Sequence, residues 1–253
     1  AAQAWMGSVT RRWVRRFGTT APRQIGLNGV GSLVVGGSTG IGKAIVQAFV
    51  SEGAKVAVAS RNLGACEAVA KGLAADGAPA VAVECDVRSR ESIRDALRFA
   101  DEALDGISVV VNAAGIVKDS LLLRAKEDDL RSMIDTNLLG AIHLTQESGK
   151  LIARHNQGGA ILHIGSVVGL DGNVGQAGYA ASKAGLLGLT KTAAAELGRK
   201  RIRVNVIAPG YISGGMTEGF PAQKIQKVCD RTLLGRLGCP EDVAAAAVFL
   251  AGQ

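Results

Sequence analysis

A tyrosine and a lysine four residues apart are the side chains of this sequence best placed to do chemistry. Tyr179 and Lys183 belong to the run Tyr-Ala-Ala-Ser-Lys. Residues four apart face the same side of a helix, so the phenol and the ammonium group should lie together. A neighbouring ammonium group favours the phenolate, and we expect it to lower the pKa of Tyr179 from its ordinary value of about 10. The pair therefore predicts a proton donor that works near neutral pH.

A glycine-rich turn far upstream predicts a nucleotide site. It follows a short apolar strand and opens a helix, and such a turn brings backbone N–H groups against a pyrophosphate. Combined with an activated tyrosine, a nucleotide cradle indicates hydride transfer to a carbonyl, with the tyrosine protonating the new alkoxide. The turn residues predicted to contact the nucleotide are Gly36, Ser38, Thr39, Gly40, Ile41 and Gly42.

The end of the next strand predicts which dinucleotide binds. An acidic residue at this point would hydrogen-bond a ribose 2′-hydroxyl and favour NAD. The sequence instead has Ser60, Arg61 and Asn62. Because these side chains suit a 2′-phosphate, NADPH is the expected cofactor. The alternative is that Arg61 is an ordinary solvated loop residue.

These residues stand in a repeating pattern of short apolar strands and helices. Such alternation implies parallel strands joined by right-handed crossovers, and strands that are apolar on both faces imply helices on both sides. We expect a single α/β domain over residues 24–253, a Rossmann-type doubly wound parallel sheet flanked by helices on both faces. The strands are predicted at 30–35, 55–59, 80–84, 107–111, 160–164 and 202–207, and the helices at 44–50, 63–75, 89–104, 127–153, 176–198 and from 240 onward.

The composition fits one large domain with an aliphatic core. Of the 253 residues, 47% are hydrophobic but only 4% are aromatic. No apolar run approaches the roughly 20 residues of a membrane span. The four cysteines form no CxxC pair and no cluster with metal-ligand spacing, which predicts free thiols, a reducing compartment and no metal site. They are Cys66, Cys85, Cys229 and Cys239.

The positive charge is concentrated at the start of the chain. Residues 1–23 hold five arginines and no acid, whereas the remainder has 24 basic and 22 acidic residues. No basic patch with interleaved aromatics is present in that remainder, so nucleic-acid binding is not expected. An arginine-rich, acid-free start resembles an organelle transit peptide, which predicts the mitochondrial matrix, with a plastid as the alternative. A basic arm is the other interpretation of residues 1–23.

Further motifs occur in the order in which the short-chain dehydrogenase/reductase family has them, and residues 30–250 resemble that family. Asp86-Val87 matches the pair that contacts adenine, and Asn112-Ala113-Ala114-Gly115 matches the family's Asn-Asn-Ala-Gly motif with alanine in its second place. Asn205 and Pro209-Gly210 match the late strand and turn. Beyond the glycine turn and the 60–62 segment, the resemblance implies cofactor contacts from Asp86, Val87, Asn112, Ala113, Ala114, Gly115, Tyr179, Lys183, Pro209, Gly210 and Ile212.

The resemblance also implies a catalytic tetrad of Asn137, Ser166, Tyr179 and Lys183. Tyr179 would donate the proton, and Lys183 would hold the ribose hydroxyls. Ser166 would polarise the substrate carbonyl, and Asn137 would hold a water that relays protons to Lys183. Each residue also has a structural alternative: Ser166 could cap the end of a strand, and Asn137 could hydrogen-bond to the backbone of its own helix.

Within the family, three stretches resemble the 3-oxoacyl-[acyl-carrier-protein] reductases and their mitochondrial carbonyl-reductase relatives. They are residues 115–122, 165–176 and 201–211. The resemblance implies reduction of a 3-oxoacyl thioester of acyl carrier protein or coenzyme A in fatty-acid synthesis. It also implies a homotetramer, or a heterotetramer with a related subunit.

Carrier docking is expected at Arg124, where such enzymes present a basic residue; the alternative is a solvated charge. Ala195 replaces a second basic docking residue, although Arg199, Lys200 and Arg201 lie close by in the sequence.

Two departures from the family pattern are expected to matter. The threonine that follows Pro-Gly aligns with Gly214, so Ser213 or Thr217 would have to take its role in holding the cofactor. The family's last strand and glycine-rich tail are missing after Gln253, which would leave a sheet edge unprotected.

Two other functions remain open at the level of sequence. One keeps the mechanism but changes the substrate, giving a broad carbonyl or quinone reductase. The other is an accessory structural subunit of a large mitochondrial assembly.

Overall fold

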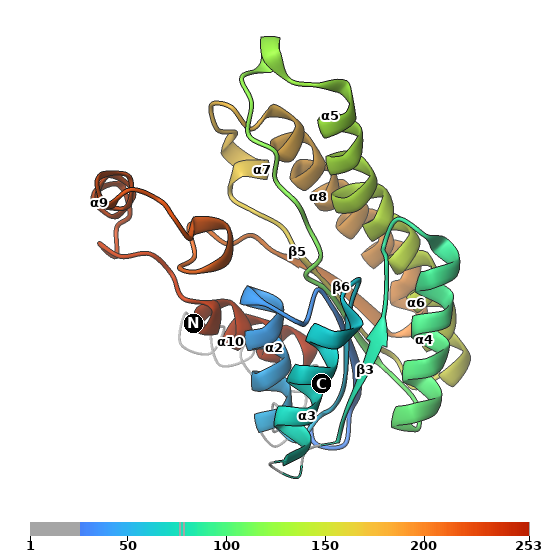
Figure 1. Ribbon diagram of the computed structural model, residues 1–253. Coiled ribbons are helices and arrows are strands. Elements are labelled where there is room, and N and C mark those ends of the chain that lie inside the picture. Colours follow the sequence, from blue (N-terminus) through green and yellow to red (C-terminus); the bar gives the residue numbers. More distant parts are fainter. Residues whose placement is uncertain (1–25, 76, 78, 253) are drawn as a thin grey trace, which may run out of the picture.

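The computed structural model describes residues 26–75, 77 and 79–252, so the predicted transit peptide at 1–23 lies outside the described residues. The described chain forms a six-stranded parallel sheet with helices on both faces (Figure 1). The predicted Rossmann-type fold is confirmed. The strands are β1 (Gly31–Val35), β2 (Lys55–Ser60), β3 (Ala80–Glu84), β4 (Val109–Asn112), β5 (Gly159–Ile164) and β6 (Ile202–Ile207).

The strand order is β3-β2-β1-β4-β5-β6. Val35 at the end of β1 is in register with Asn112 at the end of β4. The order reverses between these two strands, and their following segments leave toward opposite faces. A crevice therefore opens at the carboxyl ends of β1 and β4, where ligands bind in sheets of this type.

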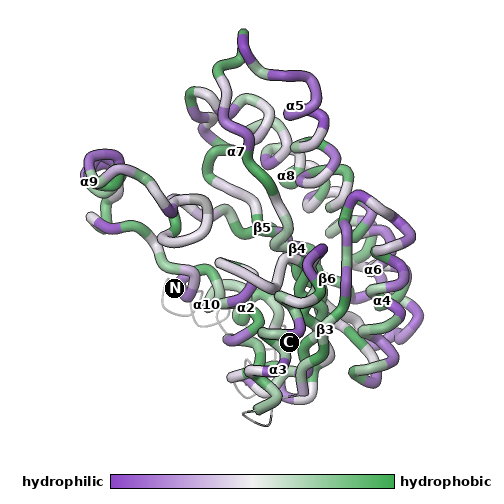
Figure 2. The backbone as a smooth tube through the Cα atoms, viewed as in Figure 1, coloured by the Kyte–Doolittle hydropathy of each residue, from purple (hydrophilic) through white to green (hydrophobic). Residues whose placement is uncertain are grey.

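Helices cover the sheet in two layers (Figure 1). The longer helices are α2 (Gly40–Ser51), α3 (Leu63–Ala75), α4 (Arg90–Leu104), α5 (Glu127–Ile134), α6 (Gly140–His155), α8 (Ala177–Leu197), α9 (Ala222–Arg231) and α10 (Pro240–Ala251). Side chains of α2, α3 and α10 join one core cluster, and side chains of α4, α6 and α8 join the other. Figure 2 shows the strands mostly green, while purple stretches of α4 and α5 lie outermost.

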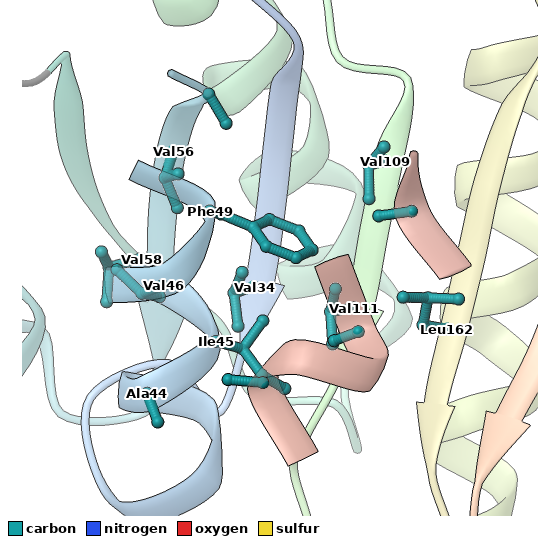
Figure 3. Close-up of a cluster of buried hydrophobic side chains, with 14 of the residues drawn as sticks. Val34, Ala44, Ile45, Val46, Phe49, Val56, Val58, Val109, Val111 and Leu162 are labelled. Carbon is teal, nitrogen blue, oxygen red and sulfur yellow. The ribbon is translucent and has the colours of Figure 1, made fainter. Parts of the chain in front are cut away.

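The core is aliphatic, as the composition predicts. Phe49 of α2 is fully buried and packs with valines of neighbouring strands, among them Val34 and Val111 (Figure 3). Strands that are buried on both faces are continuous apolar runs in the sequence, which explains why the strands could be predicted.

The helix predicted at 127–153 differs from expectation in one respect. Its path from α5 to α6 is continuous, but Asp135–Leu139 forms a π-helical segment, labelled η2. A π segment inserts one residue into the helix and is frequent at functional sites. Here it contains Asn137.

Two elements in the later part of the chain were not predicted. A single helical turn, α7 (Val168–Asp171), follows β5, and α9 stands between β6 and α10. Short 3₁₀ turns occur at η1 (Leu122–Arg124), η3 (Gly198–Lys200) and η4 (Gly215–Thr217).

All four cysteines are free in the part of the chain that the structure describes, and burial raises the pKa of the Cys85 thiol to about 12. The same residues contain no group of histidine, cysteine and acidic side chains that could hold a metal ion. No described helix is long and apolar enough to cross a membrane.

Candidate active site

Two glycines of the turn pack so closely against backbone that no side chain fits at either position. Gly36 has a φ of +83°, and a Cβ placed on it would come within 2.7 Å of the backbone of Ala113. A Cβ on Gly42 would lie 2.0 Å from the carbonyl oxygen of Gly36. At these two positions the turn therefore requires glycine. The first turn of α2 carries no acidic residue, so its free N–H groups suit a pyrophosphate.

A cleft of about 500 Å³ opens above this turn and runs along the carboxyl ends of the strands. All the residues predicted to contact the cofactor line it except Asn112, which is buried at the end of β4 and accepts a hydrogen bond from the Ala114 N–H. The lining residues that were predicted are Gly36, Ser38, Thr39, Gly40, Ile41, Gly42, Ser60, Arg61, Asn62, Asp86, Val87, Ala113, Ala114, Gly115, Tyr179, Lys183, Pro209, Gly210 and Ile212.

The end of β2 forms a polar corner of the cleft. The Ser60 hydroxyl accepts hydrogen bonds from the Ser38 hydroxyl at 3.1 Å and from the Asn62 N–H at 3.2 Å, and lies 3.1 Å from the Cys66 thiol. Arg61 is exposed beside it and has no carboxylate within 4 Å among the described residues. This corner presents hydroxyl, amide and guanidinium groups, which suit an anionic phosphate.

Asp86 lies in the cleft wall at the end of β3 and is paired with Arg88. The two side chains approach to 2.6 Å, and the hydrogen bonds from Arg88 hold the pKa of Asp86 below its ordinary value. This aspartate is therefore ionised at neutral pH, while its charge is largely compensated by its neighbour.

Tyr179 and Lys183 lie on the buried face of α8, with the Lys183 ammonium 5.7 Å from the centre of the Tyr179 ring. The Lys183 Nζ atom donates to the carbonyl oxygen of Ile164 at 2.8 Å. Burial lowers the pKa of Lys183 to about 8. The ammonium form still predominates at pH 7, so the predicted pairing of a phenol with a cation is present.

The expected pKa of Tyr179 is corrected by the structure. Burial raises the pKa of the phenol; a hydrogen bond to Ser166 opposes the rise and the charge of Asp119 adds to it. The prediction that the protein itself lowers this pKa is wrong, because burial disfavours the phenolate by more than the hydrogen bond to Ser166 favours it. The phenol is thus kept protonated, which is the form that can donate to a substrate.

Asn137 is buried beneath the cleft rather than in its wall. Its amide oxygen accepts from the Ile116 N–H at 2.8 Å, and its amide nitrogen donates to the Ile116 carbonyl at 2.9 Å and to the Ser182 hydroxyl at 3.0 Å. The side chain thus bonds backbone outside its own helix, in the loop after β4. The π-helical turn aims it there.

A polar network at the rim of the cleft was not predicted. Gln176 donates to Asp119 at 2.9 Å, and Asn173 donates to Gln176 at 2.8 Å. Asp119 and Gln176 are separated by 57 residues in the sequence. The network joins the loop after β4 to the entry of α8, on the side where Tyr179 and Ser166 face the cleft.

The wall of the cleft away from the glycine turn is largely apolar. Ile116, Val117, Val167, Val168, Tyr211 and Phe220 line it. Ser213 and Thr217, the two candidates for the missing threonine, also line the cleft. The Thr217 hydroxyl donates to the Ile212 carbonyl at 2.8 Å, whereas the Ser213 hydroxyl has no hydrogen-bond partner among the described residues.

Arg124 lies on η1, outside the cleft lining, and is exposed. The neighbouring leucines are exposed too, with Leu123 97% accessible. The residue predicted for carrier docking is therefore on the surface and does not line the cleft.

Comparison with known proteins agrees with this geometry. Residues 35–253 match the family model described as Enoyl-(Acyl carrier protein) reductase. Carbonyl reductase family member 4 of Xenopus tropicalis is 43% identical over 220 residues, which cover 86% of this chain and 89% of that protein. The human 3-oxoacyl-[acyl-carrier-protein] reductase is 41% identical over 217 residues, covering 86% and 89%.

The chain belongs to the short-chain dehydrogenase/reductase family. The 3-oxoacyl-[acyl-carrier-protein] reductase FabG of Thermotoga maritima is 40% identical over 230 residues, covering 90% of this chain and 92% of that one. Among solved structures, the crystal structure of gox2181 superposes with a TM-score of 0.87 at 30% identity and covers 90% of both chains. As a member of this family the chain is an oxidoreductase of the reductase type that uses NAD(P)(H).

Proposed function

We propose that this reductase uses NADPH to reduce a 3-oxoacyl thioester, carried by acyl carrier protein or coenzyme A, to the 3-hydroxyacyl thioester. The observation that carries the proposal is the convergence of Ser166, Tyr179 and Lys183 on one wall of a cleft whose floor is the glycine turn. Such an arrangement places a proton donor where a carbonyl can meet a bound dinucleotide. The names of the most similar relatives support the substrate class.

The proposed mechanism assigns one task to each side chain. When bound along the glycine turn, NADPH would supply the hydride for the 3-keto carbon. Ser166 hydrogen-bonds the carbonyl oxygen and polarises it. Tyr179 donates its phenolic proton to the same oxygen as negative charge develops there. Lys183, as the ammonium ion, stabilises the phenolate that remains and holds the ribose hydroxyls.

Asn137 acts indirectly in this proposal. Its side-chain amide is occupied by Ile116 and Ser182, so the amide positions the 115–117 loop that lines the cleft. The family resemblance suggests that Asn137 holds a water that relays protons to Lys183. We keep this relay as a proposal, but the side-chain amide of Asn137 is already occupied by the hydrogen bonds given above.

The preference for NADPH is supported by the polar corner at the end of β2. Ser60, Arg61 and Asn62 line the cleft there, and none of them is acidic. We expect the catalytic efficiency with NADPH to exceed that with NADH by more than about tenfold, and Arg61→Asp to reverse the preference. An unaltered preference in the Arg61→Asp variant would show that the 2′-phosphate is recognised elsewhere.

A second candidate is a broad carbonyl or quinone reductase. The apolar wall formed by Val117, Val168 and Phe220 would accept such compounds, and the relatives named carbonyl reductase support it. Substrate scope separates the candidates, because a thioester reductase should favour acyl thioesters over free ketones and quinones. A structural subunit has less support, because it has no need for three catalytic side chains around one cleft.

We further propose that Arg124 meets the acidic carrier protein, that the enzyme is a tetramer, homomeric or formed with a related subunit, and that it works in the mitochondrial matrix. An Arg124→Glu variant should raise the Michaelis constant for the carrier-linked substrate while leaving a small free ketone unaffected. Equal constants for the carrier-linked substrate would rule out docking at η1. Sedimentation at several protein concentrations tests the tetramer.

A further inference from the structure

Helix α9 carries three cations on one side and borders the cleft. Lys224, Lys227 and Arg231 are spaced three and four residues apart, which places them on the same face of the helix. All three are exposed. Within the described residues none of them has a carboxylate oxygen within 4 Å. We call this set the basic stripe.

The stripe begins at the wall of the cleft. The Lys224 ammonium lies 3.5 Å from the centre of the Phe220 ring, and Phe220 lines the cleft. A lysine on the face of an aromatic ring is held electrostatically but keeps its three N–H donors available to an anion. The first cation of the stripe is thereby held beside a residue that lines the cleft.

Other features of the 213–239 segment leave the positive charge of the stripe without an acidic partner. No residue of α9 is buried, and Figure 1 shows α9 standing away from the sheet beside the loop that follows β6. The segment contains two acids, Glu218 and Asp230, of which Asp230 accepts a hydrogen bond from Gln226 at 2.7 Å. Its fourth cation, Arg236, is paired with Asp242 at 2.8 Å. The stripe therefore provides uncompensated positive charge.

We propose that the basic stripe binds the phosphate of the pantetheine arm that carries a thioester substrate; the proposal rests on the function proposed above. The 3-oxoacyl group must reach Tyr179 inside the cleft, so the arm leaves through the open side and its phosphate lies outside. Lysine acts as a point charge for phosphate, and arginine adds a forked donor. The same phosphate is present in coenzyme A and in a carrier protein, so one stripe serves both sources.

The test compares substrates that differ in phosphate. Lys224→Gln, and a triple variant with Lys227→Gln and Arg231→Gln, are assayed with acetoacetyl-coenzyme A and with the phosphate-free N-acetylcysteamine thioester. We expect the Michaelis constant for the coenzyme A ester to rise roughly fivefold for the single change and more for the triple change. The constant for the phosphate-free ester should be unchanged, and Lys71→Gln, an exposed lysine of α3, should alter neither. Equal effects on both esters would overturn the proposal.

Two further arms complete the test. Acetoacetyl-acyl carrier protein should show the same rise as the coenzyme A ester; a rise confined to either carrier would mean that the nucleotide part or the carrier surface, not the shared phosphate, is recognised. Binding of 4′-phosphopantetheine is measured by calorimetry without turnover. Weaker binding to the triple variant is expected, and unchanged binding refutes the stripe. If neither ester is reduced, the proposed function fails, while calorimetry still decides the stripe.

Discussion

Replacing Asn137 with alanine should show whether this side chain holds the 115–117 loop in place. The amide of Asn137 satisfies both the N–H and the carbonyl of Ile116, at 2.8 and 2.9 Å, in a position that is 1% exposed. The Asn137→Ala variant leaves both backbone groups without their partner. Ser182 is less affected, because its hydroxyl also donates to the Tyr179 carbonyl at 2.8 Å.

The expected loss follows from those two groups. Each backbone group that loses its partner away from water costs about 1–3 kcal/mol, so the loss of two should lower the free energy of unfolding by about 2–6 kcal/mol. Gly115 and Ile116 line the cleft, so the dissociation constant for the cofactor should rise as well. Urea unfolding followed by circular dichroism, at pH 7 and fixed protein concentration, gives the first quantity, and cofactor titration gives the second.

The matched control is Asn173→Ala. Asn173 is also an asparagine near the cleft, but it is exposed and donates to Gln176 at 2.8 Å. Its loss should change the free energy of unfolding by no more than about 0.5 kcal/mol. A loss below about 0.5 kcal/mol in Asn137→Ala, with an unchanged denaturant slope, would refute the assignment of Asn137 as the residue that positions the 115–117 loop.

Three further predictions concern titrating groups. Burial lowers the pKa of Lys183 to about 8, below the pKa of about 10.5 that it has in the unfolded chain. The buried charge therefore opposes folding below pH 8 and no longer does so above about pH 10.5. Lys183→Met should raise the free energy of unfolding at pH 7 by about 1–3 kcal/mol, as measured by thermal melting, and should abolish turnover. Asp119→Asn removes a charge that raises the pKa of Tyr179, so the pH profile for oxidation of the hydroxy product should shift to lower pH, and an identical profile would contradict this. Glu147 is 9% exposed and is bonded by three cations, which hold its pKa at about 2 despite burial. The ion pairs of Glu147 stabilise the fold above its unfolded pKa of about 4.5, and this stabilisation is lost as the pH falls toward 2. Glu147→Gln should lower the free energy of unfolding at pH 7 by only about 1–2 kcal/mol, because the three cations are half exposed. The control Asp95→Asn removes an exposed ion pair and should change the free energy of unfolding by close to nothing.

The sequence predicted the sheet and most of the cleft because those features are encoded locally. The glycine turn, the end of β2 and the Tyr179–Lys183 spacing each specify their own geometry within a few residues. The π-helical turn at Asn137 could not be predicted, because the hydrophobic pattern from Glu127 to His155 continues through it. The Asp119–Gln176 contact joins loops that are distant in the sequence, and no local pattern reports it.

The error about Tyr179 has the same origin. The lysine four residues away is a local signal and was found, whereas the desolvation that raises the pKa depends on everything packed around the phenol. Helix α9 was missed although Ile225, Val228 and Cys229 recur at the spacing of one helix face. That amphipathic pattern is the main signal for a helix in a sequence, and it could have predicted α9.

In the proposed reaction, Tyr179 donates the proton during the NADPH-dependent reduction of a 3-oxoacyl thioester. The most direct test follows NADPH absorbance with acetoacetyl-coenzyme A, in the wild type and in Tyr179→Phe, with cofactor binding measured in both. We expect rapid oxidation of NADPH by the wild type, a rate at least about 100-fold lower in the variant, and equal binding of NADPH to both. Turnover that survives in Tyr179→Phe, or a wild type that binds NADPH but leaves the thioester unreduced, would contradict it.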